Sequence, residues 1–211
     1  MRGSRSRSIF PKAGRYRTGC LAALLAAAAG GAAIAQPTAT LTTIGKDVQV
    51  NGARAGSGTA ISFRDEIRVG PKSSARVDWP DGTHLYVAGG TVIEPDCMGW
   101  LANSHVGCGW YLVDTNHATV QVLTGTVAAP SAARFAVEVS PGPTFDVFVL
   151  GGKLAMRAGI ERRIMAAGDR VTVEPRPNAY GKPHGRFGTF SGAEGASIAG
   201  IFAPWKLPPP S

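Results

Sequence analysis

The chain has 211 residues and a formal net charge of +8, from 22 Lys and Arg and 14 Asp and Glu. Six of the basic residues and none of the acidic ones precede residue 36, so the rest of the chain carries 16 basic and 14 acidic residues. A nearly neutral chain with both signs interspersed offers no extended positive surface for a phosphate backbone. The composition therefore argues against nucleic acid as a partner.

The first 35 residues have the features of a secretory signal peptide. A basic head precedes an Ala- and Leu-rich run that begins at Leu21 and ends Ala33-Ile34-Ala35. Small residues at the third-last and last positions favour cleavage after Ala35. The run has about 15 residues, fewer than the roughly 20 that span a bilayer as a helix. We expect a periplasmic or secreted protein, with an uncleaved membrane anchor as the alternative.

Short strands are expected to begin after a linker at residues 36–43. Residues 48–93 alternate apolar and polar side chains in short runs, and each run stops at Gly, Pro, Asn or Asp. A period of two is typical of half-buried strands, and such stops are typical of the tight turns between them. In one of these runs the pattern predicts Leu85 on the inner face and His84 and Tyr86 on the outer face.

Alternation is lost between residues 94 and 116, where we expect an inserted loop. The cysteines that follow the leader, Cys97 and Cys108, both lie in it. An exported chain with an even pair of cysteines is expected to join them, and the disulfide would stabilise the fold by about 3 kcal/mol. The alternative is two reduced, buried thiols. A zinc site is not expected, because the chain has no Cys-x-x-Cys motif.

Three aromatic residues in or beside this loop are the candidate binding residues, namely Trp100, Trp110 and Tyr111. Aromatic side chains on an exposed, rigid loop are common anchors for proteins and for sugars. The alternative is that these side chains fold back and form a satellite core under the loop.

The alternating pattern resumes after the loop and continues to residue 173, so an all-β domain is predicted over residues 44–175. Beyond this domain Gly, Pro, Ser and Ala dominate the composition. Such a sequence is not expected to bury enough apolar surface to offset the entropy cost of ordering it. We therefore predict a disordered tail over residues 176–211, which acts as a spacer or as a short docking peptide.

Several turn and strand motifs follow one another in a characteristic order between residues 44 and 175. They are Val50-Asn51-Gly52, Asp65-Glu66-Ile67-Arg68-Val69-Gly70, Ser74-Ala75-Arg76-Val77, Asp81-Gly82-Thr83, Leu123-Thr124-Gly125-Thr126-Val127 and Ala167-Gly168-Asp169-Arg170-Val171. In this order the motifs resemble the FecR-like periplasmic domain family, with this chain as a stand-alone exported member. The resemblance implies an all-β stack of short strands, a solenoid- or prism-like sandwich, and binding instead of catalysis.

Residues that could carry chemistry are scattered along the chain. The four histidines show no i,i+4 pair and no acidic partner at ligand spacing, apart from a weak site that His84 would form with Asp78 or Asp81. No nucleophile, base and acid occur together in the spacing that a hydrolase needs. We therefore expect neither an enzyme nor a bound cofactor or metal.

Together these observations predict a non-enzymatic binding or scaffolding domain of the cell envelope that mediates protein–protein interaction in the periplasm. The partner would add to a strand edge or contact the aromatic residues near the cysteine loop. The alternative is a glycan- or peptidoglycan-binding module that uses Trp100, Trp110 and Tyr111. Contact with a membrane is expected only if the leader is retained.

Overall fold

The computed structural model describes residues 38–62, 65–94, 105–106, 109–116, 118–122, 125–129, 131–140, 144–158, 161–174 and 184–208. The predicted leader at residues 1–35 and the cysteines Cys97 and Cys108 lie outside the described residues. None of the helices in the described residues is long and apolar enough to cross a membrane.

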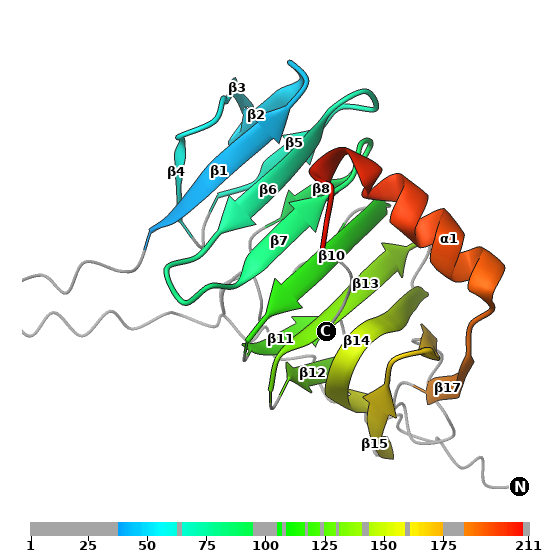
Figure 1. Ribbon diagram of the computed structural model, residues 1–211. Helices are drawn as coiled ribbons and strands as arrows, with labels where there is room; N and C mark the ends of the chain where they lie inside the picture. Colours follow the sequence, from blue (N-terminus) through cyan, green and yellow to red (C-terminus); the bar gives the residue numbers. More distant parts are fainter. Residues whose placement is uncertain are drawn as a thin grey trace, which may run out of the picture. The chain divides into compact units, whose positions relative to one another are not determined.

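The described residues form two sheets, the larger of which has 12 strands; Figure 1 shows its arrangement. In chain order these strands are β1 (Ala39–Ile44), β4 (Ala60–Ile61), β6 (Ser74–Asp78), β7 (His84–Val87), β10 (Gly109–Thr115), β11 (Ala118–Val122), β12 (Gly125–Ala129), β13 (Ala133–Val139), β14 (Phe145–Ala158), β15 (Glu161–Ala166), β16 (Asp169–Glu174) and β17 (His184–Thr189). The path across this main sheet is β11-β12-β14-β13-β10-β7-β6-β1-β4. In addition β15 and β16 pair with β14, and β17 pairs with β16.

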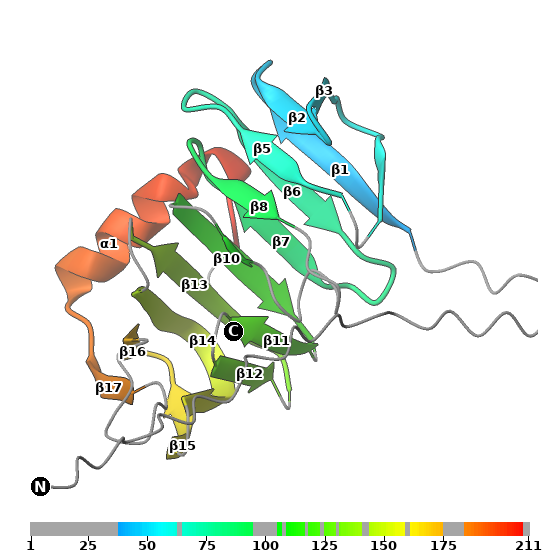
Figure 2. The same cartoon turned by 180° about the vertical axis from the view of Figure 1, so that it is seen from behind.

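A smaller sheet of five strands packs against the main sheet. In sheet order its strands are β3 (Ala53–Arg54), β2 (Val48–Val50), β5 (Ile67–Val69), β8 (Val92–Glu94) and β9 (His105–Val106). Figure 2 shows β2, β5 and β8 lying over β1, β6 and β7, and buried residues of both sheets form one hydrophobic cluster. Every strand pair among the described residues is antiparallel. The predicted all-β class is therefore confirmed. The strands form two antiparallel sheets that face each other, and not the coils of a solenoid.

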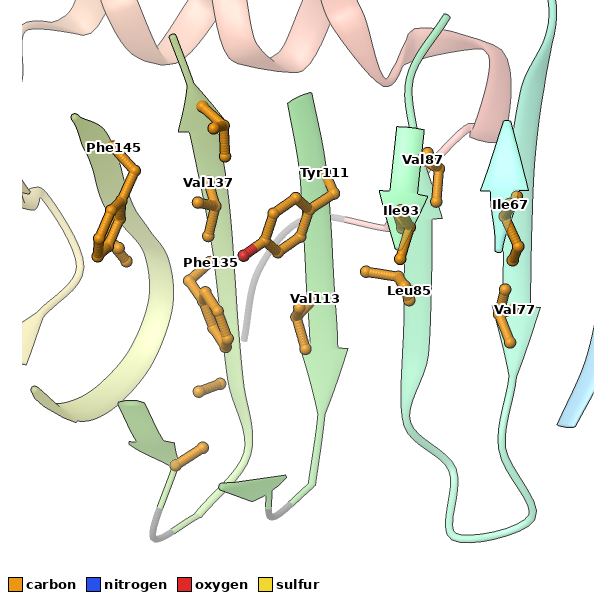
Figure 3. Close-up of a cluster of buried hydrophobic side chains, with 14 of the residues drawn as sticks. Ile67, Val77, Leu85, Val87, Ile93, Tyr111, Val113, Phe135, Val137 and Phe145 are labelled. Carbon is orange, nitrogen blue, oxygen red and sulfur yellow. The ribbon is translucent and has the colours of Figure 1, made fainter. Parts of the chain in front are cut away.

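The core between the sheets follows the period of two seen in the sequence. Val77, Leu85 and Tyr111 point inward from neighbouring strands of the main sheet, and Ile67 and Ile93 meet them from the smaller sheet (Figure 3). Each of these side chains is at most 3% exposed. Burial of one large apolar side chain contributes roughly 1.5–3 kcal/mol. Burial of the inward-facing side chains of the alternating pattern therefore stabilises the sandwich.

Strand β14 bends halfway along its length. Its first half pairs with β13 and β16, and its second half pairs with β12 and β15. At the bend Leu150 is an extra residue in the pairing with β13, which makes a β-bulge. Gly152 follows with a φ of +71°, and a Cβ there would lie 2.1 Å from the carbonyl oxygen of Ala132. The bend therefore requires glycine at this position.

The predicted insertion at residues 94–116 is wrong for its last part. Gly109–Thr115 form β10, which lies between β7 and β13 near the middle of the main sheet. Tyr111 and Val113 face the core, whereas Leu112 is buried on the opposite face. Both faces of this strand are covered, so its sequence does not alternate between apolar and polar residues.

The predicted disorder of residues 176–211 is wrong for residues 184–208. These residues form β17, the helix α1 (Gly192–Ile201) and the short 3-10 helix η1 (Ala203–Trp205). The helix lies on the face of the main sheet that is opposite the smaller sheet (Figure 1). Ile198 and Phe202 are only 2% and 1% exposed there. A few well-spaced apolar residues suffice to order this segment, because the sheet face that they meet is itself apolar.

Candidate functional site

The outer face of the main sheet carries an apolar band. Four cross-strand neighbours on β7, β10, β13 and β14 form it, each at most 6% exposed, namely Tyr86, Leu112, Ala136 and Phe148. Ile198 and Phe202 of the C-terminal segment complete one hydrophobic cluster with them. The prediction that Tyr86 faces solvent is therefore wrong, because the C-terminal segment covers this side chain.

Two arginines lie at the ends of this band. The Arg76 Cζ atom is 6.0 Å from the ring centroid of Tyr86 and 5.6 Å from that of Trp205. At the other end, the Arg170 Cζ atom is 5.1 Å from the ring centroid of Phe148. These distances are within the range of cation–π attraction. The apolar band thus ends in positive charge on both sides.

Arg170 also ties the helix to the sheet. Its Nε donates to Asp146 Oδ1 and its Nη1 donates to Glu194 Oε1 on α1, both at 2.9 Å. The hydrogen bond to Asp146 raises the pKa of Arg170. The pKa of Glu194 is lowered, mainly because its carboxylate accepts a hydrogen bond from the backbone N–H of Ser191. The ionised forms of both side chains are therefore favoured where α1 begins.

A row of polar side chains runs beside the apolar band. Its members are cross-strand neighbours, namely Asp78, His84, Asp114 and Arg134. His84 Nδ1 lies 2.6 Å from Asp78 Oδ1, so these two candidates of the weak site meet in the structure. Asp81 instead accepts a hydrogen bond from a backbone N–H of its own turn. Among the described residues, no group of three or more His, Cys, Asp and Glu could hold a metal ion.

A groove of about 510 Å³ lies between the apolar band and the C-terminal segment. This volume is in the range of sites for small ligands. Its walls include Leu112 and Leu150 from the sheet, Ile198 from α1, and Phe202 and Leu207 from the chain that follows. The groove is thus built mainly from apolar side chains of elements that are far apart in the sequence.

Arg134 is the buried charged residue of this groove. Its side chain is 9% exposed. Nε and Nη2 donate to Asp114 Oδ2 at 3.1 and 2.5 Å, and Nη1 donates to the carbonyl oxygen of Pro208. Lys206 is a second, exposed cation among the lining residues, and no acidic residue occurs among them. The groove therefore combines apolar walls with positive charge.

A second surface is the edge strand β15. Within the described part of the chain it pairs with β14 alone. Met165 is the one residue of this strand that is buried, whereas Ile164 is 72% exposed. Lys153, Arg157 and Arg162 occupy outward positions of the β14–β15 hairpin. Lys153 pairs with Ala166, and Arg157 pairs with Arg162. The surface thus presents one large apolar side chain among three cations.

The predicted aromatic site is not assembled by the described residues. Tyr111 is 2% exposed and belongs to the core (Figure 3). Trp110 is half-buried, and its ring stacks on Phe148 with 5.6 Å between the centroids. Trp100 lies outside the described residues, as do the two cysteines. Of the three aromatic candidates, Trp110 and Tyr111 therefore serve packing.

Sequence reasoning missed the groove, although two signals for its helix are present. Ser191-Gly192-Ala193-Glu194 is a capping box, in which the Ser191 hydroxyl accepts from the Glu194 backbone N–H and the Glu194 carboxylate accepts from the Ser191 backbone N–H. Ile198 and Phe202 then follow at helical spacing. Arg134 gives no comparable signal, because its contact with Pro208 joins distant parts of the chain.

Comparisons with known proteins found only distant similarity to solved structures. No family model and no curated protein matches this chain. It is similar to two crystal structures of a "putative anti-sigma factor" from Parabacteroides distasonis, with 16% and 15% sequence identity and TM-scores of 0.48 and 0.47. The similarity covers 63% of this chain and 63% and 62% of the other two. The chain thus matches less than two thirds of the length of these proteins.

Proposed function

We propose that the chain is a non-enzymatic, FecR-like binding domain of the cell envelope that holds a protein partner along β15. The observation that carries this proposal is the exposure of Ile164 on an edge strand. Edge strands bind extended peptides through main-chain hydrogen bonds, and alternate side chains select the peptide. Proteins usually protect such edges with charge, so a large exposed apolar side chain there indicates a contact surface.

The charge of the hairpin indicates the kind of partner. The outward positions of β14 and β15 hold Lys153, Arg157 and Arg162 and no acidic residue, and Arg163 lies over the Phe187 ring with 4.8 Å from Cζ to the centroid. Opposite charge across an interface speeds association and excludes partners of like charge. We therefore infer that the bound segment is extended and acidic, with an apolar residue that meets Ile164.

The envelope location and the family rest on the sequence. The leader resembles a signal peptide, which supports export to the periplasm. Those residues of the FecR-like motifs that the structure describes lie on strands and turns; Gly82 and Gly168, for example, have φ values of +83° and +95° in tight turns. A glycan-binding module is less well supported, because Tyr111 is buried in the core.

The test places a photo-crosslinking amino acid at position 164 of the full chain, expressed in its own host cells. Position 44 is the matched control, because Ile44 is 38% exposed and lies on β1 near the opposite end of the main sheet. We expect protein adducts from position 164 and not from position 44. We also expect the double charge reversal K153E/R162E, at two outward positions of the hairpin, to reduce these adducts several-fold. Equal adducts from both positions, or adducts that the charge reversal leaves unchanged, would exclude β15 as the binding edge.

A further inference from the structure

The groove under α1 is lined almost entirely by apolar side chains. Apart from Arg134 and Lys206, its lining residues are Leu, Ile, Phe, Ala, Gly and Pro, which have no polar side-chain atoms. A bound polypeptide would bring a series of amide groups that such walls cannot satisfy, and each unsatisfied amide is costly. The walls thus match a ligand whose polar atoms are confined to one end.

The two polar side chains of the lining, Arg134 and Lys206, suit an anionic group. The Arg134 guanidinium is held by Asp114 and by the carbonyl oxygen of Pro208, which fixes its orientation. These three bonds do not use all of its N–H groups. Lys206 adds an exposed ammonium among the lining residues. A carboxylate accepts hydrogen bonds from a guanidinium in a bidentate manner and gains from a second cation nearby.

We propose that the groove binds a long-chain carboxylic acid, with its hydrocarbon chain against the partly exposed side chains of Leu150, Phe190 and Leu207 and its carboxylate at Arg134 and Lys206. The ligand enters between the sheet and the C-terminal segment, which supply opposite walls. This site is separate from β15 and does not depend on the function proposed for that edge.

The test uses dodecanoate labelled with ¹³C at the carboxyl carbon and the full chain in solution. We expect one saturable bound resonance, whose titration midpoint lies at lower pH than that of free dodecanoate because the cations favour the ionised form. Dodecanol has the same chain without the charge, and we expect it to bind at least tenfold more weakly. Equal binding of dodecanol, or no saturable resonance, would overturn the proposal.

Two variants of α1 locate the ligand. Ala199 and Ala196 are both exposed on the helix, but only Ala199 is among the lining residues of the groove. We expect A199W to abolish dodecanoate binding and A196W to leave it unchanged. Undiminished binding to A199W would place the ligand elsewhere and contradict the proposal.

The charge is tested by K206Q, which we expect to weaken dodecanoate several-fold and to leave the binding of dodecanol unchanged. Lys206 is exposed, so this variant is expected to fold even if A199W does not. An apolar peptide with a free C-terminal carboxylate provides the competing ligand. Binding of that peptide without binding of dodecanoate would show a protein-recognition groove and overturn the proposal.

Discussion

Arg134 on β13 donates a hydrogen bond to the carbonyl oxygen of Pro208, 74 residues further along the chain. The same guanidinium donates to Asp114 on the neighbouring strand β10. Arg134 thus joins the end of the C-terminal segment to two neighbouring strands of the sheet. Its side chain is almost fully buried, whereas that of Asp114 is 28% exposed, so the ion pair is only partly shielded from solvent.

We expect D114N to lower the free energy of unfolding by about 1–3 kcal/mol, because it leaves the buried guanidinium without its counter-charge. Urea unfolding measures this loss. In the double variant D114N/R134M the charge is gone as well, so we expect a smaller cost than the sum of the two single variants. Additive costs would contradict direct coupling between these two residues.

The capping box of α1 is expected to stabilise the C-terminal segment. S191A removes the hydroxyl that accepts from the Glu194 backbone N–H, and we expect a cost of about 1 kcal/mol. Ser197 is exposed within the same helix and provides the control. S197A should be neutral or slightly stabilising, because alanine has the higher helix propensity. Urea unfolding of both variants compares them, and an equal effect of the two would exclude a capping role for Ser191.

Glu138 is expected to make stability depend on pH. Burial raises the pKa of Glu138, and the neighbouring carboxylate of Asp146 raises it further, while Arg170 acts in the opposite direction. A carboxyl with a raised folded pKa favours folding below its unfolded pKa, and this contribution is lost as the pH rises through the folded pKa. We therefore expect E138Q to be more stable than the parent at neutral pH and equal to it in acid. Urea unfolding at several pH values measures this difference, and a gain that is independent of pH would contradict the assignment.

Two glycines are expected to respond in opposite directions to the same substitution. G152A should cost at least about 2 kcal/mol, because the φ of +71° disfavours a side chain and a Cβ would collide with the Ala132 carbonyl oxygen. Gly200 in α1 has nothing within 4 Å of a Cβ, so G200A should stabilise by roughly 0.5–1 kcal/mol. Thermal or urea unfolding measures both. A tolerated G152A would show that the bend in β14 can relax.

The period of two was enough to predict the all-β class and the inward-facing position of Leu85. It failed at Tyr86, which lies at an outward position and is nevertheless buried by the C-terminal segment. It failed also at β10, because a strand covered on both faces has no polar side to reveal its period. The prediction of binding residues was less accurate than that of the fold, because Tyr111 is part of the core.

The sequence by itself determined which side chains alternate, where the chain turns, and how charge is distributed along it, because these are properties of neighbouring residues. Only the tertiary structure decided that residues 184–208 are ordered, that Arg134 meets Pro208, and that Ile164 is left exposed at an edge. Each of these outcomes depends on what a second, distant segment contributes. The outer face of the sheet is apolar only when its strands are assembled side by side, and the C-terminal segment becomes ordered because that assembled face gives its few apolar residues a surface on which to be buried.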